Sequence, residues 1–423
     1  MLIFAKQPLT MKKYFLLSLL LVSFLSVTAQ IQEEINAPEN IKTIVFKGET
    51  EDQFPIALLG DPIYLEFDDI TAGEYDYYYK ITHCNYDWTP SDLLKSQYLN
   101  GIDDQRITDY NNSYNTLQPY SNYKLTIPND NVRLKISGNY MLEVYDSNYE
   151  IVFSRRFVVY QDLVTVGVTP KRTRDFEFIT EKQITQININ YSNFSLVNPK
   201  KEVKLAIIQN YYWPTSLQNI KPQFTLGTEL VYKYDSETSF YAGNEFLNFD
   251  TKDLRSATAA ISSIELTDLY NHYLFTDIFR NDRPYTYFPD INGDFVVRTL
   301  QGDDSSREAE YTKIHFSLPY KAQIDMDDIY VFGKFNNYAL TAENKMIFNA
   351  ENGLLEATIL MKQGFYNYKY VTKQGDTIDL NKISGNFHNT ENHYLVLVYY
   401  RNFGDLYDSI IGIGSASATN ISN

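Results

Sequence analysis

Residues 75–84 read YDYYYKITHC, and this stretch decides the fold class. Five of its residues alternate onto one face with the period of two that a half-buried β-strand requires: Tyr75, Tyr77, Tyr79, Ile81 and His83. A break follows at residues 89–91, TPS, and then about thirty polar and aromatic residues without a clear period, too many for an ordinary hairpin turn. The stretch therefore predicts a strand that leads into a long aromatic loop.

The aromatic residues of this loop are candidates for contact with a partner protein. Tyrosine and tryptophan make large, rigid, amphipathic contacts at protein interfaces. The candidate interface residues are Trp88, Tyr98, Tyr110, Tyr114 and Tyr120. The alternative is that the same side chains pack inside the protein, and the sequence leaves both interpretations open.

The composition extends the β prediction to the whole chain. Its 423 residues are 44% hydrophobic, enough for two or three domains, and 37 tyrosines stand against 18 glycines and 14 prolines. Tyrosine suits pleated, half-wet surfaces. Short alternating segments separated by turn residues recur along the sequence. We therefore expect an all-β protein made of tandem immunoglobulin- or fibronectin-like β-sandwich domains with long aromatic loops.

The segment pattern suggests three domains and two flanking segments. We expect an N-terminal β-sandwich over residues 30–163, a β-rich middle domain over 164–316, a C-terminal β-sandwich over 317–405 and a flexible tail over 406–423. The third block resembles the early-set immunoglobulin-like modules that include glycogen-binding domains. Those modules stack tryptophans on sugar rings, whereas no tryptophan follows Trp213 here.

The N-terminus has the features of a secretory signal peptide over residues 1–29. A basic start at residues 11–13, MKK, is followed by an apolar run over 14–27, and the small residues VTA at 27–29 suit cleavage before Gln30. Met11 is the expected natural start. The alternative, a membrane anchor, needs a run of roughly 20 apolar residues, which is longer than this one.

The rest of the sequence bears on the environment of the exported chain. No later run is long and apolar enough for a membrane helix, so no direct membrane insertion is expected. Beyond residue 29 the chain has 34 basic and 53 acidic residues, a net charge of −19, which disfavours nucleic acid as a partner. The single cysteine, Cys84, cannot form an internal disulfide. Export to the periplasm of a Gram-negative cell fits these features.

No residue pattern indicates catalysis. His83 and Cys84 are adjacent, so on a strand their side chains point to opposite faces and cannot act as a nucleophile pair. His388, Glu391 and His393 contain metal-ligating groups, but their spacing matches no helical metal motif. We expect no catalytic residues, no metal, no cofactor and no small-molecule substrate.

Several sequence words occur in an order that points to a known family. They include HCNYDWTPS at residues 83–91, YLNG at 98–101 and SGNY at 137–140. With these words the sequence resembles the type IX secretion system plug proteins of Bacteroidetes over nearly all of the exported chain, most specifically over residues 75–160. The resemblance implies a non-enzymatic periplasmic protein. It also implies a partner, the large outer-membrane translocon barrel, whose periplasmic opening such proteins seal when no cargo-shuttle partner is docked.

Two other functions remain open at this stage. One is a periplasmic glycan-binding or glycan-processing protein, which the third block and the loop aromatics would suit. The other is a cell-surface adhesion module. The plug interpretation is the one that the resemblance favours.

Overall fold

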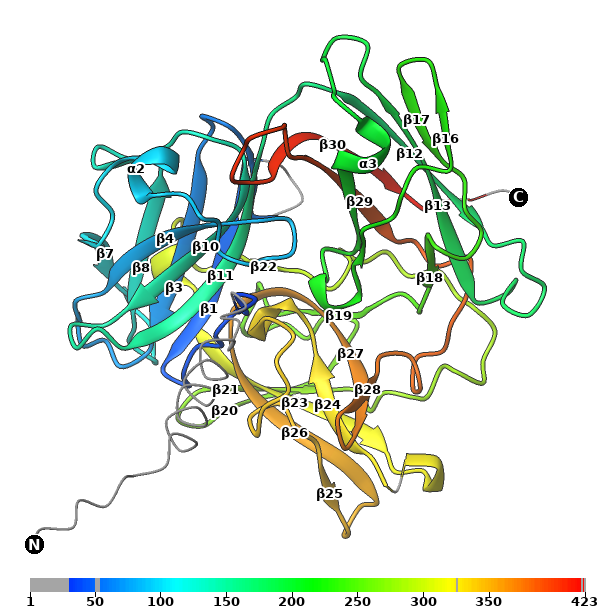
Figure 1. Cartoon of the computed structure of the whole chain (residues 1–423). Coiled ribbons are helices and arrows are strands. Elements are labelled where there is room, and N and C mark those ends of the chain that lie inside the picture. The colour runs from blue at the N-terminus through cyan, green and yellow to red at the C-terminus, as the bar shows by residue number, and fades with distance from the viewer. Residues whose placement is uncertain (1–29, 50–53, 325, 420, 422–423) are drawn as a thin grey trace, which may run out of the picture.

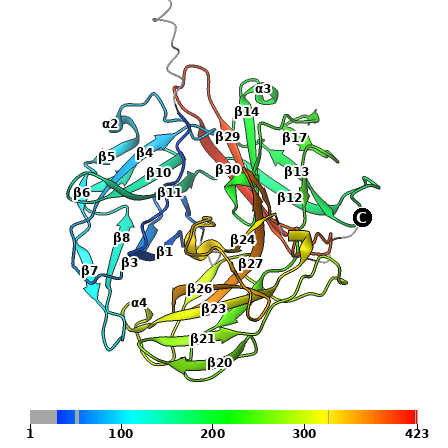
Figure 2. The ribbon, with the colours of Figure 1, turned by 90° about the horizontal axis from the view of Figure 1, so that it is seen from below.

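The computed structural model describes residues 30–49, 54–324, 326–419 and 421. The expected signal peptide, residues 1–29, lies outside these residues. The described chain is built almost entirely of strands, which confirms the all-β prediction. Its sheets form three lobes arranged around a common centre (Figure 1, Figure 2).

The first lobe is a sandwich of two mostly antiparallel sheets, coloured blue to teal in Figure 1, in which only β2 and β11 pair in parallel among the described strands. One sheet has the order β1-β3-β8-β7: Ile41–Lys47, Ile63–Asp69, Ser121–Ile127 and Asp109–Asn112. The other has the order β2-β11-β10-β4-β6: Ile56–Leu58, Ile151–Tyr160, Gly138–Tyr145, Tyr78–Cys84 and Gln105–Arg106. The strand expected from the opening stretch is β4. As its alternation predicts, Tyr77, Tyr79 and Ile81 are buried in the core between the two sheets.

The long loop after β4 contains only short elements. They are the helix α2 (Lys95–Tyr98), the strand β5 (Leu99–Gly101) and the edge strands β6 and β7. β5 pairs with β9 (Val132–Leu134), which follows β8. The chain thus crosses from one sheet of the first lobe to the other through this loop. The loop packs over the sandwich, because Tyr98, Leu99 and Ile107 all belong to the core of the lobe.

The second lobe combines the middle of the chain with its C-terminal end. One sheet has the order β12-β13-β17-β16, with β18 also paired to β13: Thr165–Arg172, Lys182–Asn190, Glu229–Tyr232, Phe224–Leu226 and Ser239–Tyr241. The other has the order β15-β14-β29-β30: Leu217–Gln218, Val203–Gln209, His393–Tyr400 and Ser409–Ser417. Two short helices, α3 (Pro199–Glu202) and η1 (Trp213–Thr215), flank β14.

The third lobe lies between these two parts of the sequence. One sheet has the order β20-β21-β23-β26-β25: Ile261–Leu266, Tyr270–Leu274, Tyr311–Pro319, Leu354–Lys362 and Ile347–Asn349. Facing it, the long strand β27 pairs with four shorter strands. The long strand β27 is Gly364–Gln374. Its four partners are β19 (Leu247–Asp250), β22 (Phe295–Val297), β24 (Asp328–Phe332) and β28 (Thr377–Asp379). Three short helices complete the lobe: α4 (Ser305–Glu308), η2 (Ala322–Ile324) and η3 (Lys334–Asn336).

The sheets contradict two of the expected boundaries. The boundary between residues 316 and 317 falls inside β23, which pairs with β26 over its whole length. The tail expected to be flexible contains β30, whose Ile410 and Ile411 are buried. The reason is long-range pairing: β29 returns to β14 about 190 residues earlier in the chain, and local periodicity carries no information on such a partner.

Within the described part of the chain, no helix has the length and apolar character needed to cross a membrane.

Candidate functional site

The five aromatic residues expected at an interface are distributed between the interior and the surface. Trp88, Tyr98 and Tyr120 are buried, with 2%, 6% and 0% of their surface exposed. Tyr110 is half-buried against the first-lobe core, and only Tyr114, at 64% exposure, is freely accessible. The expectation of one partner-facing surface is therefore wrong for the three buried residues. Packing inside the protein, the alternative interpretation, describes them.

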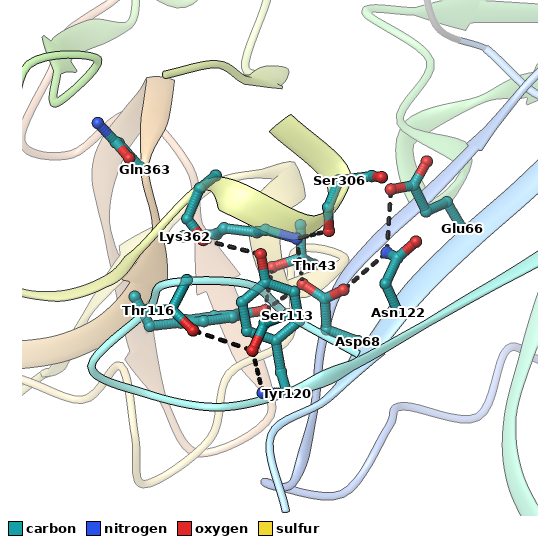
Figure 3. A network of polar contacts seen from close by, with 12 residues as sticks. Thr43, Glu66, Asp68, Ser113, Thr116, Tyr120, Asn122, Ser306, Lys362 and Gln363 are labelled. Atoms are coloured by element: carbon teal, nitrogen blue, oxygen red, sulfur yellow. Dashed lines mark hydrogen bonds and ion pairs between the residues drawn. The ribbon is translucent and has the colours of Figure 1, made fainter. Parts of the chain in front are cut away.

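The first seam between lobes is built around a buried ion pair (Figure 3). Asp68 at the end of β3 and Lys362 at the end of β26 come from the first and third lobes. Lys362 Nζ lies 2.7 Å from Asp68 Oδ2, and the two side chains are 1% and 0% exposed. Lys362 also donates to the main-chain oxygen of Ser306 at 2.9 Å. A charge pair so completely removed from water requires further hydrogen bonds to be tolerated.

Two neutral donors complete the surroundings of Asp68. The Tyr311 hydroxyl donates to Oδ2 at 2.7 Å, and Asn122 Nδ2 donates to Oδ1 at 2.8 Å. The Thr43 and Tyr311 hydroxyls also lie 2.6 Å apart, so β1 of the first lobe joins the same network. Every oxygen of the buried carboxylate thus has a partner, and the partners come from both lobes.

Tyr120 belongs to this seam. Its hydroxyl donates to the main-chain oxygen of Ala309 at 2.8 Å, and its ring lies 4.1 Å from Lys362 Nζ and 5.3 Å from the Tyr311 ring. Burial, followed by the nearby charge of Asp68, raises the pKa of Tyr120 far above its usual value. The hydroxyl therefore stays protonated and acts as a donor. A loop residue that the sequence offered as a candidate for partner contact thus packs against the third lobe of its own chain.

The second seam joins the first and second lobes through the two tryptophans. The Trp88 and Trp213 rings meet edge to face with centroids 4.9 Å apart, and the Arg156 guanidinium lies 4.5 Å above the Trp88 ring. Trp88 has a backbone φ of +65°, an uncommon conformation for a bulky residue. Its burial between the two lobes offsets the strain of that turn.

A buried aspartate strengthens the same seam. Asp408, fully buried, pairs with Lys204 at 3.0 Å and Arg401 at 2.8 Å, all three from the second lobe. It also accepts the main-chain N–H of Tyr86, and Arg401 donates to Asn85 Oδ1 at 2.7 Å. Both of these contacts reach the turn after β4. The motif at residues 83–91 therefore supports lobe packing.

The third seam, between the second and third lobes, concentrates carboxylates. Glu245, 1% exposed, accepts hydrogen bonds from the Tyr285 hydroxyl and from the main-chain N–H of Glu391. Asp290 accepts the main-chain N–H groups of Phe246 and Asn292. Burial raises the pKa of Asp290 to about 7; the two main-chain donors oppose this rise, and the charges of Glu245 and Glu391 add to it. This seam is therefore sensitive to protonation near neutral pH.

A cavity of about 510 Å³ lies where the three lobes meet. Its walls come from every lobe. They include Ile41 and Arg156 of the first, Tyr211 and Trp213 of the second, and Phe335, Asn336 and Tyr338 of the third. The N-terminal segment, defined here as residues 30–37, lines it through Glu33, Glu34, Asn36 and Ala37. Domain junctions of this kind are common locations of ligand sites.

The remaining candidates for chemistry have structural surroundings. Burial raises the pKa of the Cys84 thiol to about 12 and lowers the pKa of His83 to about 4, so both are neutral at pH 7. A neutral, buried thiol is a poor nucleophile. His83 Nδ1 lies 2.9 Å from Ser91 Oγ. Across the described ranges, no group of three or more histidine, cysteine or acidic residues is placed to hold a metal ion.

Comparison with known proteins assigns the family. Residues 41–161 match the family model described as the first domain of the type 9 secretion system plug protein. A crystal structure of a hypothetical protein from Parabacteroides merdae ATCC 43184 has 30% sequence identity to this chain. It covers 92% of this chain and 100% of its own, with a TM-score of 0.86. The chain belongs to the type IX secretion system plug family.

Other comparisons add little. A putative membrane anchored protein from Corynebacterium diphtheriae has 9% identity over 89% of this chain and 92% of its own, with a TM-score of 0.13 that carries no structural argument. A search of curated proteins finds no match. Plug-family membership supports a role related to type IX secretion and a periplasmic or envelope location, and it suggests a structural rather than enzymatic role.

The family match covers the first lobe, from the start of β1 to the end of β11. The Parabacteroides merdae structure extends the likeness to all three lobes. The residues that sequence reasoning missed are those of the seams, above all Asp68, Tyr311 and Lys362. A signal for Lys362 existed, because this charge ends β26 directly after the apolar residues 359–361.

Proposed function

We propose that this plug-family chain is a non-enzymatic seal. In this proposal it occupies the periplasmic opening of the outer-membrane translocon barrel of the type IX secretion system while no cargo-shuttle partner is bound. The proposal includes export through the signal peptide at residues 1–29 and residence in the periplasm beside the barrel. The barrel is its principal partner.

The observation that carries the proposal is the way the three lobes are joined. A seal across a wide opening must not open by internal motion, because a lobe that swings away would leave a leak. The first and third lobes share the fully buried pair Asp68–Lys362, and the first and second share the Trp88–Trp213 contact. Separating the first and third lobes exposes buried charges to water, and separating the first and second exposes large aromatic surfaces. Both changes cost free energy.

The surface charge suits a contact that must also release. The exported chain has a net charge of −19, so copies of it repel one another, and in this proposal charged side chains form the rim of its contact with the barrel. Rim charges govern the association rate and the salt dependence more than the final affinity. A plug held in this way can leave when a competing partner arrives.

The test is recovery of the barrel with the tagged, exported chain from solubilised outer membranes, identified by mass spectrometry. The comparison is between cells that contain the cargo-shuttle partner and cells that lack it. We expect the translocon barrel to be recovered, and more of it when the shuttle is absent. Recovery of the chain without the barrel in both strains, together with binding to soluble glucans or peptidoglycan fragments, contradicts the seal and supports the glycan-binding alternative.

A further inference from the structure

The chain crosses between the second and third lobes twice, and the two crossings are bonded to each other. The first linker, residues 242–246, leads from β18 to β19, and the second linker, residues 380–392, returns from β28 to β29 (Figure 1). Gly243 O accepts the main-chain N–H of Phe387 at 2.8 Å and the hydroxyl of Thr390 at 2.9 Å. The two linkers therefore form one bonded unit at this seam.

The loop between β21 and β22 fastens onto both linkers. On the first linker, Asp290 of the loop accepts the main-chain N–H of Phe246. The Tyr285 hydroxyl lies within hydrogen-bond distance of Glu245 Oε1 on the first linker and of Asn389 O, at 3.1 Å, on the second. The loop contains no helix or strand, and loops of this length usually have a role in function. Two carboxylates, one on the loop and one on the linker, thus hold it in place.

These two carboxylates are buried without full hydrogen bonding. Glu245 is 1% exposed, and its Oε1 accepts two hydrogen bonds, whereas its Oε2 has no partner among the described residues. Asp290 accepts from the main-chain N–H groups of Phe246 and Asn292. Arg280 Nη2 donates to the main-chain oxygen of Glu245 at 2.7 Å. A buried carboxylate oxygen that lacks a donor favours the protonated, neutral form of its group.

The charges around the pair act in the same direction. Burial raises the pKa of Asp290 to about 7; its main-chain donors oppose this rise, and the charges of Glu245 and Glu391 add to it. The cations that face the pair are Arg280 of the loop and Lys369 of β27. The other titratable groups around it are Tyr285, Tyr287, Tyr338 and Asp277, which faces Arg280. Carboxylates outnumber cations in this group, which favours retention of a proton.

We propose that this crossing is a latch operated by one proton. The proton, held by Glu245 and Asp290 together, keeps the β21–β22 loop on the two linkers, and its loss releases the loop locally while the three lobes stay in place. Tyr287 and Phe288 lie on this loop and are 55% and 49% exposed, so the proton sets the shape of an aromatic surface. The latch is independent of the seal, so either proposal can fail without the other.

The experiment is hydrogen exchange of the exported chain, residues 30–423, measured by mass spectrometry at pH 5, 6, 7 and 8 and corrected for the intrinsic exchange rate. The reporters are peptides that contain Phe246 and Asn292, whose N–H groups bond Asp290. Release of the loop returns the pKa of Asp290 from about 7 to the ordinary 3.8, so each opening releases a proton between these values. Exchange should therefore rise about tenfold to fiftyfold from pH 5 to pH 7, and less than about twofold from pH 7 to pH 8.

Reference amides distinguish local release from unfolding of the lobe. The amides of β23 and β26, in the core of the third lobe, exchange only when the lobe unfolds. At pH 7 the reporter amides should exchange at least about tenfold faster than these reference amides. Low concentrations of urea should leave the reporter exchange unchanged, because a local release exposes little surface.

A charge-removing variant identifies the groups that hold the proton. Glu245→Gln keeps the acceptor Oε1 and places an amide donor at the position of the unpartnered Oε2. With one negative charge fewer beside it, Asp290 loses its proton at lower pH, so the rise from pH 5 to pH 7 should shrink about threefold or more. Glu265→Gln, the matched change at an exposed position on β20, should leave the rise unaltered.

Three results overturn the proposal: reporter exchange that does not change from pH 5 to pH 7, reporter amides that exchange no faster than the amides of β23 and β26 at pH 7, or a rise that Glu245→Gln leaves as large as Glu265→Gln does. A further tenfold rise from pH 7 to pH 8 also contradicts it, because another group would then control the release. The first two results need only the unaltered chain, so the test does not depend on the folding of a variant.

Discussion

Replacement of Lys362 by methionine tests whether the seam between the first and third lobes is as strong as its geometry implies. The variant keeps the length of the side chain but leaves the Asp68 carboxylate, 0% exposed, without its counter-ion. Removing one partner of a buried pair costs about 3–5 kcal/mol. Asp68 keeps the neutral donors Tyr311 and Asn122, at 2.7 and 2.8 Å, so we expect a loss near the lower end, about 3 kcal/mol.

The assay is equilibrium urea unfolding of the exported chain, followed by circular dichroism, as a double-mutant cycle with Asp68→Asn. Each single variant should lose about 3 kcal/mol, because each leaves one buried charge unpaired. The double variant has no buried charge and should lose only about 1–2 kcal/mol. The coupling energy, which is the difference between the summed single losses and the loss of the double variant, is then about 4–5 kcal/mol, as expected for a buried charge pair in direct contact.

A matched control is Arg174→Met, which removes an exposed ion pair. Arg174 and Asp235 also lie 2.7 Å apart, but their side chains are 68% and 44% exposed, so the unfolding midpoint should hardly change. The reasoning is refuted if Lys362→Met and Arg174→Met have the same small effect. The reasoning is refuted too if the stability losses of Lys362→Met and Asp68→Asn simply add in the double variant, since the two side chains would then have no coupling energy across the seam.

Three further predictions concern the other seams and the surface. The pKa of Asp290 is about 7 in the folded protein and has the ordinary value of 3.8 in the unfolded chain. Between these two pH values the carboxyl group is therefore protonated in the folded protein and ionised in the unfolded chain. The stability of the folded protein falls as pH rises through that window; Asp290→Asn should flatten this decline in urea unfolding between pH 4 and 8, and an unchanged slope would contradict the assignment. Trp213→Ala should cost about 3–5 kcal/mol in the same assay, and a loss below about 1 kcal/mol would show that the seam with Trp88 is loosely packed. Tyr114→Ala, at 64% exposure, should leave the melting temperature unchanged, whereas a clear drop would place Tyr114 in a packed contact.

The sequence predicted what short-range patterns can encode. The alternation over residues 75–84 identified β4 and its buried face, because the period of two reports directly on which side chains face a core. The all-β class followed from many such segments. The division into lobes could not be predicted in this way. β29 pairs with β14 across about 190 residues, and no local sequence feature of either strand identifies its partner.

The interface candidates show a second limit of the sequence. Trp88 and Tyr114 lie in the same aromatic loop region, yet one is buried in a seam and the other is exposed. An aromatic residue that binds another lobe and one that binds another protein obey the same physical chemistry, since both need apolar area and a polar edge. Sequence alone therefore identifies contact residues without stating whether the contact is within the chain or with a partner.

The seams also constrain how the proposed seal could open. The single cysteine is buried in the first lobe, so no disulfide holds the lobes together and the seams alone set their relative positions. A hinge motion between the first and third lobes would have to separate Asp68 from Lys362 and bring water to both charges, which costs several kcal/mol before any new contact forms. Breaking contacts at an exposed polar rim costs far less for each contact. Release of the chain from a partner as one rigid body is therefore favoured over release by separation of its lobes.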